Sequence, residues 1–179
     1  MALKRLIIDG YGQIEPNNVT FTRDGRVEAQ CALDEDLVAE NGMLLAVDAA
    51  NGIVKLPEES ETLPIALNYT SERIYNQFTP GLKNFHLEAN KGHCPRMGYL
   101  TIGEIFTTNC LCYDTSEFTA ETNLKEAIQA TGTTPVYGGI STTGAIKLTK
   151  TKPTVGPVLR VVKATTMPDG QYAVELQVQ

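Results

Sequence analysis

The chain has 179 residues, of which 42% are hydrophobic and 20% are charged, and it contains no tryptophan. A chain of this length forms one large domain or two small ones. It buries enough apolar surface to fold without disulfide bonds or a structural metal ion. Its net charge of −6 and pI near 5.0 argue against nucleic-acid binding, because a nucleic-acid-binding protein needs basic surface to displace counterions. No apolar run approaches the roughly 20 residues of a transmembrane helix, and the first residues contain too short an apolar stretch for a signal peptide. We therefore expect a protein that is made in a cytoplasm and does not associate with a membrane.

Turn chemistry is the strongest local signal along the chain. Asp-Gly and Asn-Gly dipeptides favour the positive backbone angles of tight turns. They occur at Asp9-Gly10, Asp24-Gly25, Asn41-Gly42, Asn51-Gly52 and Asp169-Gly170. Short apolar or alternating runs flank them and predict strands. The predicted strands are Leu3–Asp9, Arg26–Ala32, Met43–Asp48, Gly52–Leu56, Ile65–Tyr69, Tyr99–Thr107, Ala145–Thr149, Val158–Ala164 and Gln171–Gln177.

Helix is scarce in the predicted structure. The best candidate runs from Asn123 to Ala130, with Thr122 or Asn123 as its N-cap and Gly132 just beyond its end. The segment from Asp34 to Glu40 is a candidate for one or two further helical turns. The last two strands, joined by Thr-Met-Pro-Asp-Gly, predict a C-terminal β-hairpin, because proline presets φ and Asp-Gly reverses the chain.

These elements predict a mainly β fold with one or two small antiparallel β-barrel or sandwich units and one short helix. Prolines and glycines interrupt the strand pattern from Thr79 to Pro95. We place a boundary there, between an N-terminal β unit (residues 1–90) and a C-terminal barrel-like unit (residues 91–179). A single domain remains the alternative.

The four cysteines do not form the pattern of a disulfide framework. Two of them, Cys110 and Cys112, follow His86, His93 and Cys94, which raises the possibility of a zinc site. Structural zinc sites use Cys pairs separated by two to four residues, and the single-residue gap here fits poorly. On a strand the two thiols share a face, so we interpret them as buried and assign no metal ligand.

The sequence contains partial matches to enzyme motifs but no complete one. Gly10-Tyr11-Gly12 lacks the third glycine of a dinucleotide-binding turn, because Glu15 stands in its place. The segment Gly139–Gly144 has the glycine spacing of a P-loop but lacks its lysine, and we interpret it as a Gly/Thr-rich turn between strands. No Gly-x-Ser-x-Gly elbow occurs. We therefore expect a protein that is not an enzyme, with no catalytic or cofactor-binding residue to assign.

Four segments share a pattern of short strands and turn dipeptides: Glu15–Arg26, Glu40–Asp48, Tyr99–Asn109 and Val161–Gln171. Taken together they resemble bacteriophage head-decoration (capsid cement) proteins, which are small, β-rich and often without enzymatic motifs. The resemblance implies a virion protein that binds the outside of an assembled capsid and stabilises it. It implies the major capsid protein as partner and a lattice-bound chain or a homo-oligomer, with a trimer as the simplest guess. The loops Thr79–Pro95 and Thr131–Gly144 are the predicted contact surfaces.

Two alternatives remain open at this stage. A tail-tube or head–tail connector subunit would use Thr79–Pro95 to reach a neighbouring ring. A surface-binding β module, such as a carbohydrate-binding domain, would present exposed aromatic residues, and the low aromatic content of 7% argues against it.

Overall fold

The computed structural model describes residues 2–22, 31–70 and 82–179, and these residues fold into a mainly β structure. The strands in chain order are β1 (Leu3–Arg5), β2 (Ile14–Glu15), β3 (Ala32–Leu33), β4 (Val38–Ala39), β5 (Leu44–Asp48), β6 (Ile53–Lys55), β7 (Ile65–Asn68), β8 (Leu87–Glu88), β9 (Met97–Gly98), β10 (Ile105–Thr108), β11 (Leu111–Asp114), β12 (Tyr137–Gly139), β13 (Ile146–Thr149), β14 (Leu159–Thr166) and β15 (Tyr172–Val178). One α-helix, α1 (Glu121–Gln129), and two short 3₁₀ helices, η1 (Leu82–Asn84) and η2 (Ala89–Lys91), complete the described elements. The predicted fold class is confirmed.

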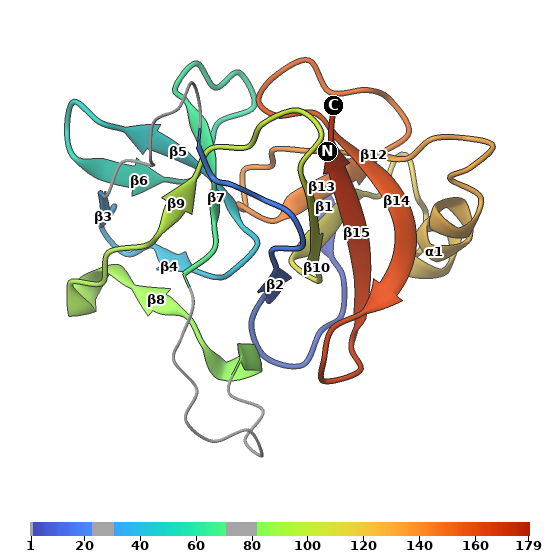
Figure 1. Ribbon diagram of the computed structural model, residues 1–179, viewed down its shortest axis with the longest axis horizontal. Helices are drawn as coiled ribbons and strands as arrows, with labels where there is room; N and C mark the ends of the chain where they lie inside the picture. Colours follow the sequence, from blue (N-terminus) through green and yellow to red (C-terminus); the bar gives the residue numbers. More distant parts are fainter. Residues whose placement is uncertain (1, 23–30, 71–81) are drawn as a thin grey trace.

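The largest sheet has eight strands in the order β1-β11-β13-β12-β14-β15-β10-β2 and curls into a half-barrel. All neighbours are antiparallel except β11 and β13, which run parallel. A second sheet has five strands in the order β3-β6-β5-β7-β9, and β4 pairs with β8 in a two-stranded ribbon. Figure 1 shows the five-stranded sheet on the left, the half-barrel on the right and α1 on the outer side of β14.

Strands from both sides of residue 90 enter both large sheets. β1 and β2 lie at the two edges of the eight-stranded sheet, whose other strands all follow residue 90. β9 completes the five-stranded sheet, whose other strands all precede residue 90. The predicted boundary between residues 1–90 and 91–179 therefore does not coincide with the division between sheets.

The core joins the two sheets. One cluster of buried side chains includes Leu44 and Leu67 from the five-stranded sheet together with Leu111 and Leu176 from the half-barrel. A backbone hydrogen bond from the Leu44 N–H to the Gly144 carbonyl, 2.9 Å long, links the same two sheets. Burial of these faces against each other is the main favourable contribution to folding.

The C-terminal hairpin forms as predicted. β14 and β15 pair antiparallel from Leu159↔Val178 to Thr166↔Tyr172, with a bulge between Val161 and Lys163. The Gly170 N–H donates to the Met167 carbonyl across the turn at 2.8 Å. Along β15 the buried Val174, Leu176 and Val178 alternate with the partly exposed Glu175 and Gln177, whereas Ala173 is buried as well, so the period-two pattern does not extend to the start of the strand.

The helix also forms, but it begins two residues earlier than predicted. Ala120 is the N-cap, in an extended conformation and without a side-chain hydrogen bond, so neither Thr122 nor Asn123 caps it. Leu124 and Ile128 are fully buried on one face, as the i, i+4 spacing predicts. Glu121 in the first turn pairs with Lys125 at 2.6 Å and suits the helix dipole, which favours the earlier start.

Several other predictions need correction. The segment from Asp34 to Glu40 contains a turn and the short strand β4, and no helix. The predicted strand Leu3–Asp9 ends at Arg5, and the predicted strand Tyr99–Thr107 is broken by a turn at Ile102–Gly103. The sequence analysis did not predict six of the described strands: β2, β4, β8, β9, β11 and β12. The predicted strand Arg26–Ala32 lies largely outside the described residues.

Candidate functional site

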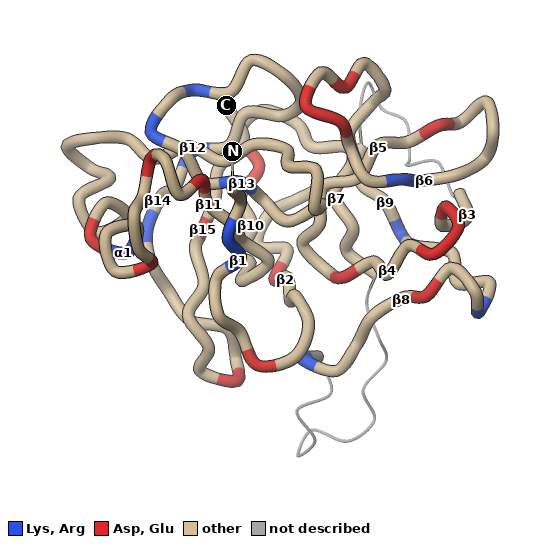
Figure 2. The backbone as a smooth tube through the Cα atoms, turned by 180° about the vertical axis from the view of Figure 1, so that it is seen from behind, with Lys and Arg blue, Asp and Glu red and all other residues tan. Residues whose placement is uncertain are grey.

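An acidic run between β3 and β4 forms one side of a surface pocket. Asp34, Glu35 and Asp36 follow β3 directly, and Figure 2 shows them as a red stretch between the labels of β3 and β4. The Asp34 N–H donates to the Val54 carbonyl at 2.9 Å, which fixes the start of the run to β6. Asp36 adopts a left-handed φ of 62°, a conformation that aspartate tolerates better than most residues. The chain therefore reverses at Asp36 and places all three carboxylates near the surface.

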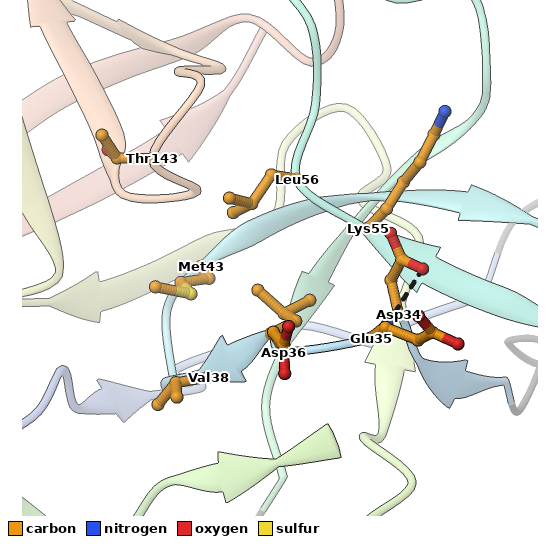
Figure 3. Close-up of a pocket in the computed structure, with 9 residues that line it drawn as sticks. Asp34, Glu35, Asp36, Val38, Met43, Lys55, Leu56 and Thr143 are labelled. Atoms are coloured by element: carbon orange, nitrogen blue, oxygen red, sulfur yellow. Dashed lines mark hydrogen bonds between the residues drawn. The ribbon is translucent and has the colours of Figure 1, made fainter. Parts of the chain in front are cut away.

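The other side of the pocket is apolar. Val38, Met43 and Leu56 line it, and Thr143 from the half-barrel closes its edge. In Figure 3 these four side chains lie together, Asp34 and Glu35 lie opposite, and Asp36 lies between the two groups. The cavity has a volume of about 390 Å³, at the low end of the roughly 300–1,000 Å³ of small-ligand sites. The pocket is therefore divided into an apolar half and an acidic half.

Gly144 sets the apolar wall, because it lets the two sheets approach closely. Its φ of +79° is left-handed, and a Cβ there would lie 3.1 Å from Leu56 Cδ2 and 3.2 Å from Met43 Sδ. The hydrogen bond that its carbonyl accepts from the Leu44 N–H holds the turn against β5. The segment Gly139–Gly144, predicted as a Gly/Thr-rich turn between strands, does connect β12 to β13, and its Thr143 lines the edge of the pocket.

The carboxylates of Glu35 and Asp36 are exposed, and neither forms an ion pair with the residues that the structure describes. One oxygen of Asp34 accepts the Glu35 N–H at 3.0 Å. Lys55 is the basic residue at the rim, and Figure 3 shows its side chain extending away from the apolar half. The carboxylates of Glu35 and Asp36 thus have no cationic partner within the described part of the chain.

The carboxylate of Glu40, four residues after Asp36, is buried. Glu40 is 6% exposed and receives both terminal nitrogens of Arg5 in a bidentate pair, with Nη1 2.7 Å from Oε1. The Gly12 N–H donates to the same carboxylate at 2.5 Å. The hydrogen bond to Glu40 raises the pKa of the Arg5 guanidinium. We call Arg5, Gly12 and Glu40 the N-terminal junction, because it fastens residues 5–12 to the start of the five-stranded sheet.

The junction is tightly packed around Gly12. A Cβ at this position would lie 2.7 Å from the Asn41 carbonyl oxygen and 2.7 Å from Cys110 Cβ. Only glycine allows the backbone to come this close. Its neighbour Gln13 donates its N–H to Asn109 Oδ1 at 2.7 Å, which continues the attachment toward β2. These interactions hold the N-terminal segment against Glu40, Asn41 and Asn109.

Three of the four cysteines are buried and only Cys94 is exposed. Burial raises the pKa of the Cys110 and Cys112 thiols, so both stay protonated at neutral pH. A protonated thiol is a poor nucleophile and a poor metal ligand. The interpretation of these two residues as buried thiols on one strand, β11, is confirmed for Cys112, and Cys110 lies just before the strand.

The two histidines lie around Glu88. His86 stacks on Tyr11 with ring centroids 4.0 Å apart and places Nε2 2.9 Å from a Glu88 carboxylate oxygen. His93 Nδ1 accepts the Glu88 N–H at 3.0 Å. The zinc alternative required both histidines to converge with the cysteines. Among residues 2–22, 31–70 and 82–179, no group of three or more His, Cys, Asp or Glu side chains has a geometry that could hold a metal ion.

The pocket was not predicted as a site, although parts of its signal are in the sequence. The segment from Asp34 to Glu40 was a candidate for helical turns, and the predicted contact loops were Thr79–Pro95 and Thr131–Gly144. Thr143 in the second loop does line the pocket, whereas residues 79–81 of the first lie outside the described residues. Nothing in the sequence signals that residues 34–38, 43, 55–56 and 143 meet.

Comparison with protein-family models, with curated proteins and with solved structures gave no match. Within the described part of the chain, none of the helices has the length and apolar character needed to cross a bilayer.

Proposed function

We propose that this chain is a structural protein of a phage particle that binds the outer surface of an assembled capsid and stabilises it. Its partner is the major capsid protein, and its role involves no catalysis. The partner class follows from the resemblance of Glu15–Arg26, Glu40–Asp48, Tyr99–Asn109 and Val161–Gln171 to head-decoration proteins.

The observation that carries this proposal is the contrast between interior and surface chemistry. Several chemically reactive groups are engaged inside the fold, with the Cys110 and Cys112 thiols protonated in the core and Glu40 held by Arg5. The described pocket, by contrast, offers exposed apolar side chains beside carboxylates that form no ion pair with the described residues. A surface that is part apolar and part charged is typical of protein–protein contact sites.

Attachment to the lattice stabilises the capsid by mass action. A protein that binds neighbouring subunits only when they are assembled shifts the equilibrium toward the assembled form. Many copies, each held by modest contacts, resist internal pressure together, and linked contacts on one oligomer add avidity. A trimer at threefold positions of the lattice is the arrangement we propose, since it matches the symmetry of such a junction.

Quantitative mass spectrometry of virions purified from the source of the sequence tests the proposal. A copy number equal to the major capsid protein, or a simple fraction of it such as one-third, is the expected result. A ratio of a few per cent would instead favour a tail-tube or connector subunit. Absence from the particle would refute a virion role altogether.

A second experiment tests stabilisation directly. Purified protein is added to capsids that lack it, and the capsids are then heated or exposed to osmotic shock. We expect saturable binding and a higher temperature of DNA release. Binding without any gain in heat or osmotic resistance would contradict the cement role.

A further inference from the structure

We infer that the pocket between β4, β6 and the turn after β12 binds a basic side chain, lysine or arginine, from the partner's surface. The aliphatic stem of that side chain packs on Val38, Met43 and Leu56, and its charged head lies among Asp34, Glu35 and Asp36. The identity of the partner as a capsid protein rests on the proposed function, whereas the chemistry of the bound group rests on the pocket alone.

The apolar half matches a side-chain stem. Val38 is 42% exposed and Leu56 38%, and they are two of the five large apolar side chains that are exposed in the described part of the chain. Met43, 5% exposed, lies beneath them as a floor. Lysine and arginine carry three or four methylene groups that bury along apolar surface while the charged end stays in contact with water. Covering Val38 and Leu56 in this way is favourable, because it removes apolar area from water.

The acidic half matches the charged head. Three carboxylates in consecutive positions repel one another and gain no described ion pair in compensation. One Asp34 oxygen is engaged by the Glu35 N–H, which holds the run in one shape. An incoming ammonium or guanidinium group relieves the repulsion and gains charge-assisted hydrogen bonds.

Other occupants fit the pocket less well. Three carboxylates repel any phosphate, nucleotide or acidic peptide. A bare metal ion is disfavoured because the described residues include no ligand cluster of suitable geometry. No aromatic side chain is among those that line the cavity, so the stacking platform of a sugar or base site is missing. A cation with an aliphatic stem remains as the occupant that uses both halves.

The test uses a small probe with the isolated full chain. ¹⁵N-labelled protein is titrated with N-acetyl-Ala-Arg-Ala-amide, and the neutral isostere N-acetyl-Ala-citrulline-Ala-amide serves as the matched control. We expect chemical-shift changes for residues 34–38, 55–56 and 143 with the arginine peptide and weak changes with the citrulline peptide. At about 1 M salt the difference should disappear, because exposed charges are screened over a few ångströms. Equal shifts with both peptides, or shifts that map elsewhere, would overturn the inference.

Two variants separate the halves of the pocket. Asp36→Asn removes one charge while keeping a residue that tolerates the left-handed φ, and it should weaken arginine-peptide binding about two- to fivefold. Leu56→Ser removes part of the apolar half and should weaken binding about three- to tenfold. Glu59→Gln and Ile102→Ser are the matched controls, since both residues are exposed and neither lines the pocket. Unchanged binding in Asp36→Asn and Leu56→Ser would refute the assignment.

Capsid binding distinguishes failure of this inference from failure of the proposed function. If the unmodified chain binds capsids and the two pocket variants bind equally well, the pocket is not the contact and the inference is wrong. If the peptide binds the pocket but the chain does not bind capsids, the capsid role is wrong and the pocket chemistry stands.

Discussion

Asp36 and Glu40 lie four residues apart in the chain, yet their carboxylates have opposite surroundings. Glu40 is 6% exposed and is held by Arg5 and the Gly12 N–H. Asp36 is exposed at the rim of a pocket and forms no ion pair with the described residues. The comparison teaches that the same chemical group is buried in an ion pair in one place and exposed without a described partner in the other, according to which segments pack around it.

We therefore expect one set of acidic residues to stabilise the fold and another to bind a partner. A buried charge that loses its partner is left without solvation, so changes at the N-terminal junction should destabilise the fold. Exposed acidic residues contribute little to stability, so changes at the pocket should affect binding and leave the fold intact. The following predictions test this division, from the largest expected effect to the smallest.

Glu40→Gln should lower the free energy of unfolding by about 2–3 kcal/mol. The substitution keeps the shape but removes the charge that pairs with Arg5, and breaking a fully buried pair typically costs ~3–5 kcal/mol. The loss is smaller here because the Arg5 side chain is 36% exposed and regains some hydration. Urea denaturation measures the change, with Glu35→Gln as the control expected to stay within ~0.5 kcal/mol. Equal losses in the two variants would contradict the comparison.

Gly12→Ala should destabilise the protein by about 2 kcal/mol, in the range typical of overpacked cores. The new methyl group would meet the Asn41 carbonyl oxygen and Cys110 Cβ, each at 2.7 Å, and backbone cannot move aside as a flexible side chain can. Gly132→Ala is the matched control, because a Cβ there meets nothing within 4 Å. Thermal unfolding of both variants checks the prediction, and a neutral Gly12→Ala would show that the junction is loosely packed.

Stability should fall as the pH rises above about 8.5, the pKa of a cysteine in an unfolded chain. Burial raises the pKa of Cys110 and Cys112 in the folded state, so the unfolded chain loses these protons first and is favoured as pH rises. Below that pH the contribution of both thiols is fully present. The limiting slope is about 1.4 kcal/mol per pH unit for each thiol.

Urea denaturation between pH 7.5 and 9.5 measures this slope. Cys110→Ala should make it shallower, whereas Cys94→Ala should leave it unchanged because Cys94 is exposed. Alkylation of the native protein should modify Cys94 first. Rapid modification of Cys110 would show that the core opens readily.

Asp36→Asn should change the free energy of unfolding by no more than about 0.5 kcal/mol, and the change should be a gain. Removing one of three adjacent negative charges relieves repulsion, and asparagine also tolerates the left-handed φ. The gain should be seen at about 10 mM salt and vanish near 1 M, because the charges are exposed and screened. A loss of stability at low salt would mean that Asp36 has a structural partner.

The local features of the fold were predictable because they depend on neighbours in the chain. Asn51-Gly52 predicts the turn between β5 and β6, and Gly52 does adopt a positive φ of 69°. The alternation in β15 and the i, i+4 spacing of Leu124 and Ile128 predict the buried faces that the structure has. β11 and β12 were not predicted, because cysteine and tyrosine in one and two glycines in the other give no distinctive strand pattern. They form strands through long-range pairing, β11 with β1 and β13, and β12 with β13 and β14.

The sequence by itself determined a mainly β chain, its C-terminal hairpin, the approximate position of its helix and the burial of Cys110 and Cys112, since each follows from periodicity or turn chemistry within a few residues. Only the tertiary structure decided that β1 pairs with β11, that Arg5 meets Glu40, and that residues 34–38, 43, 55–56 and 143 surround one pocket. These contacts join residues up to 111 positions apart, as in the pairing of Leu3 with Asp114. Whether such residues meet depends on how whole sheets pack, which a local pattern does not encode.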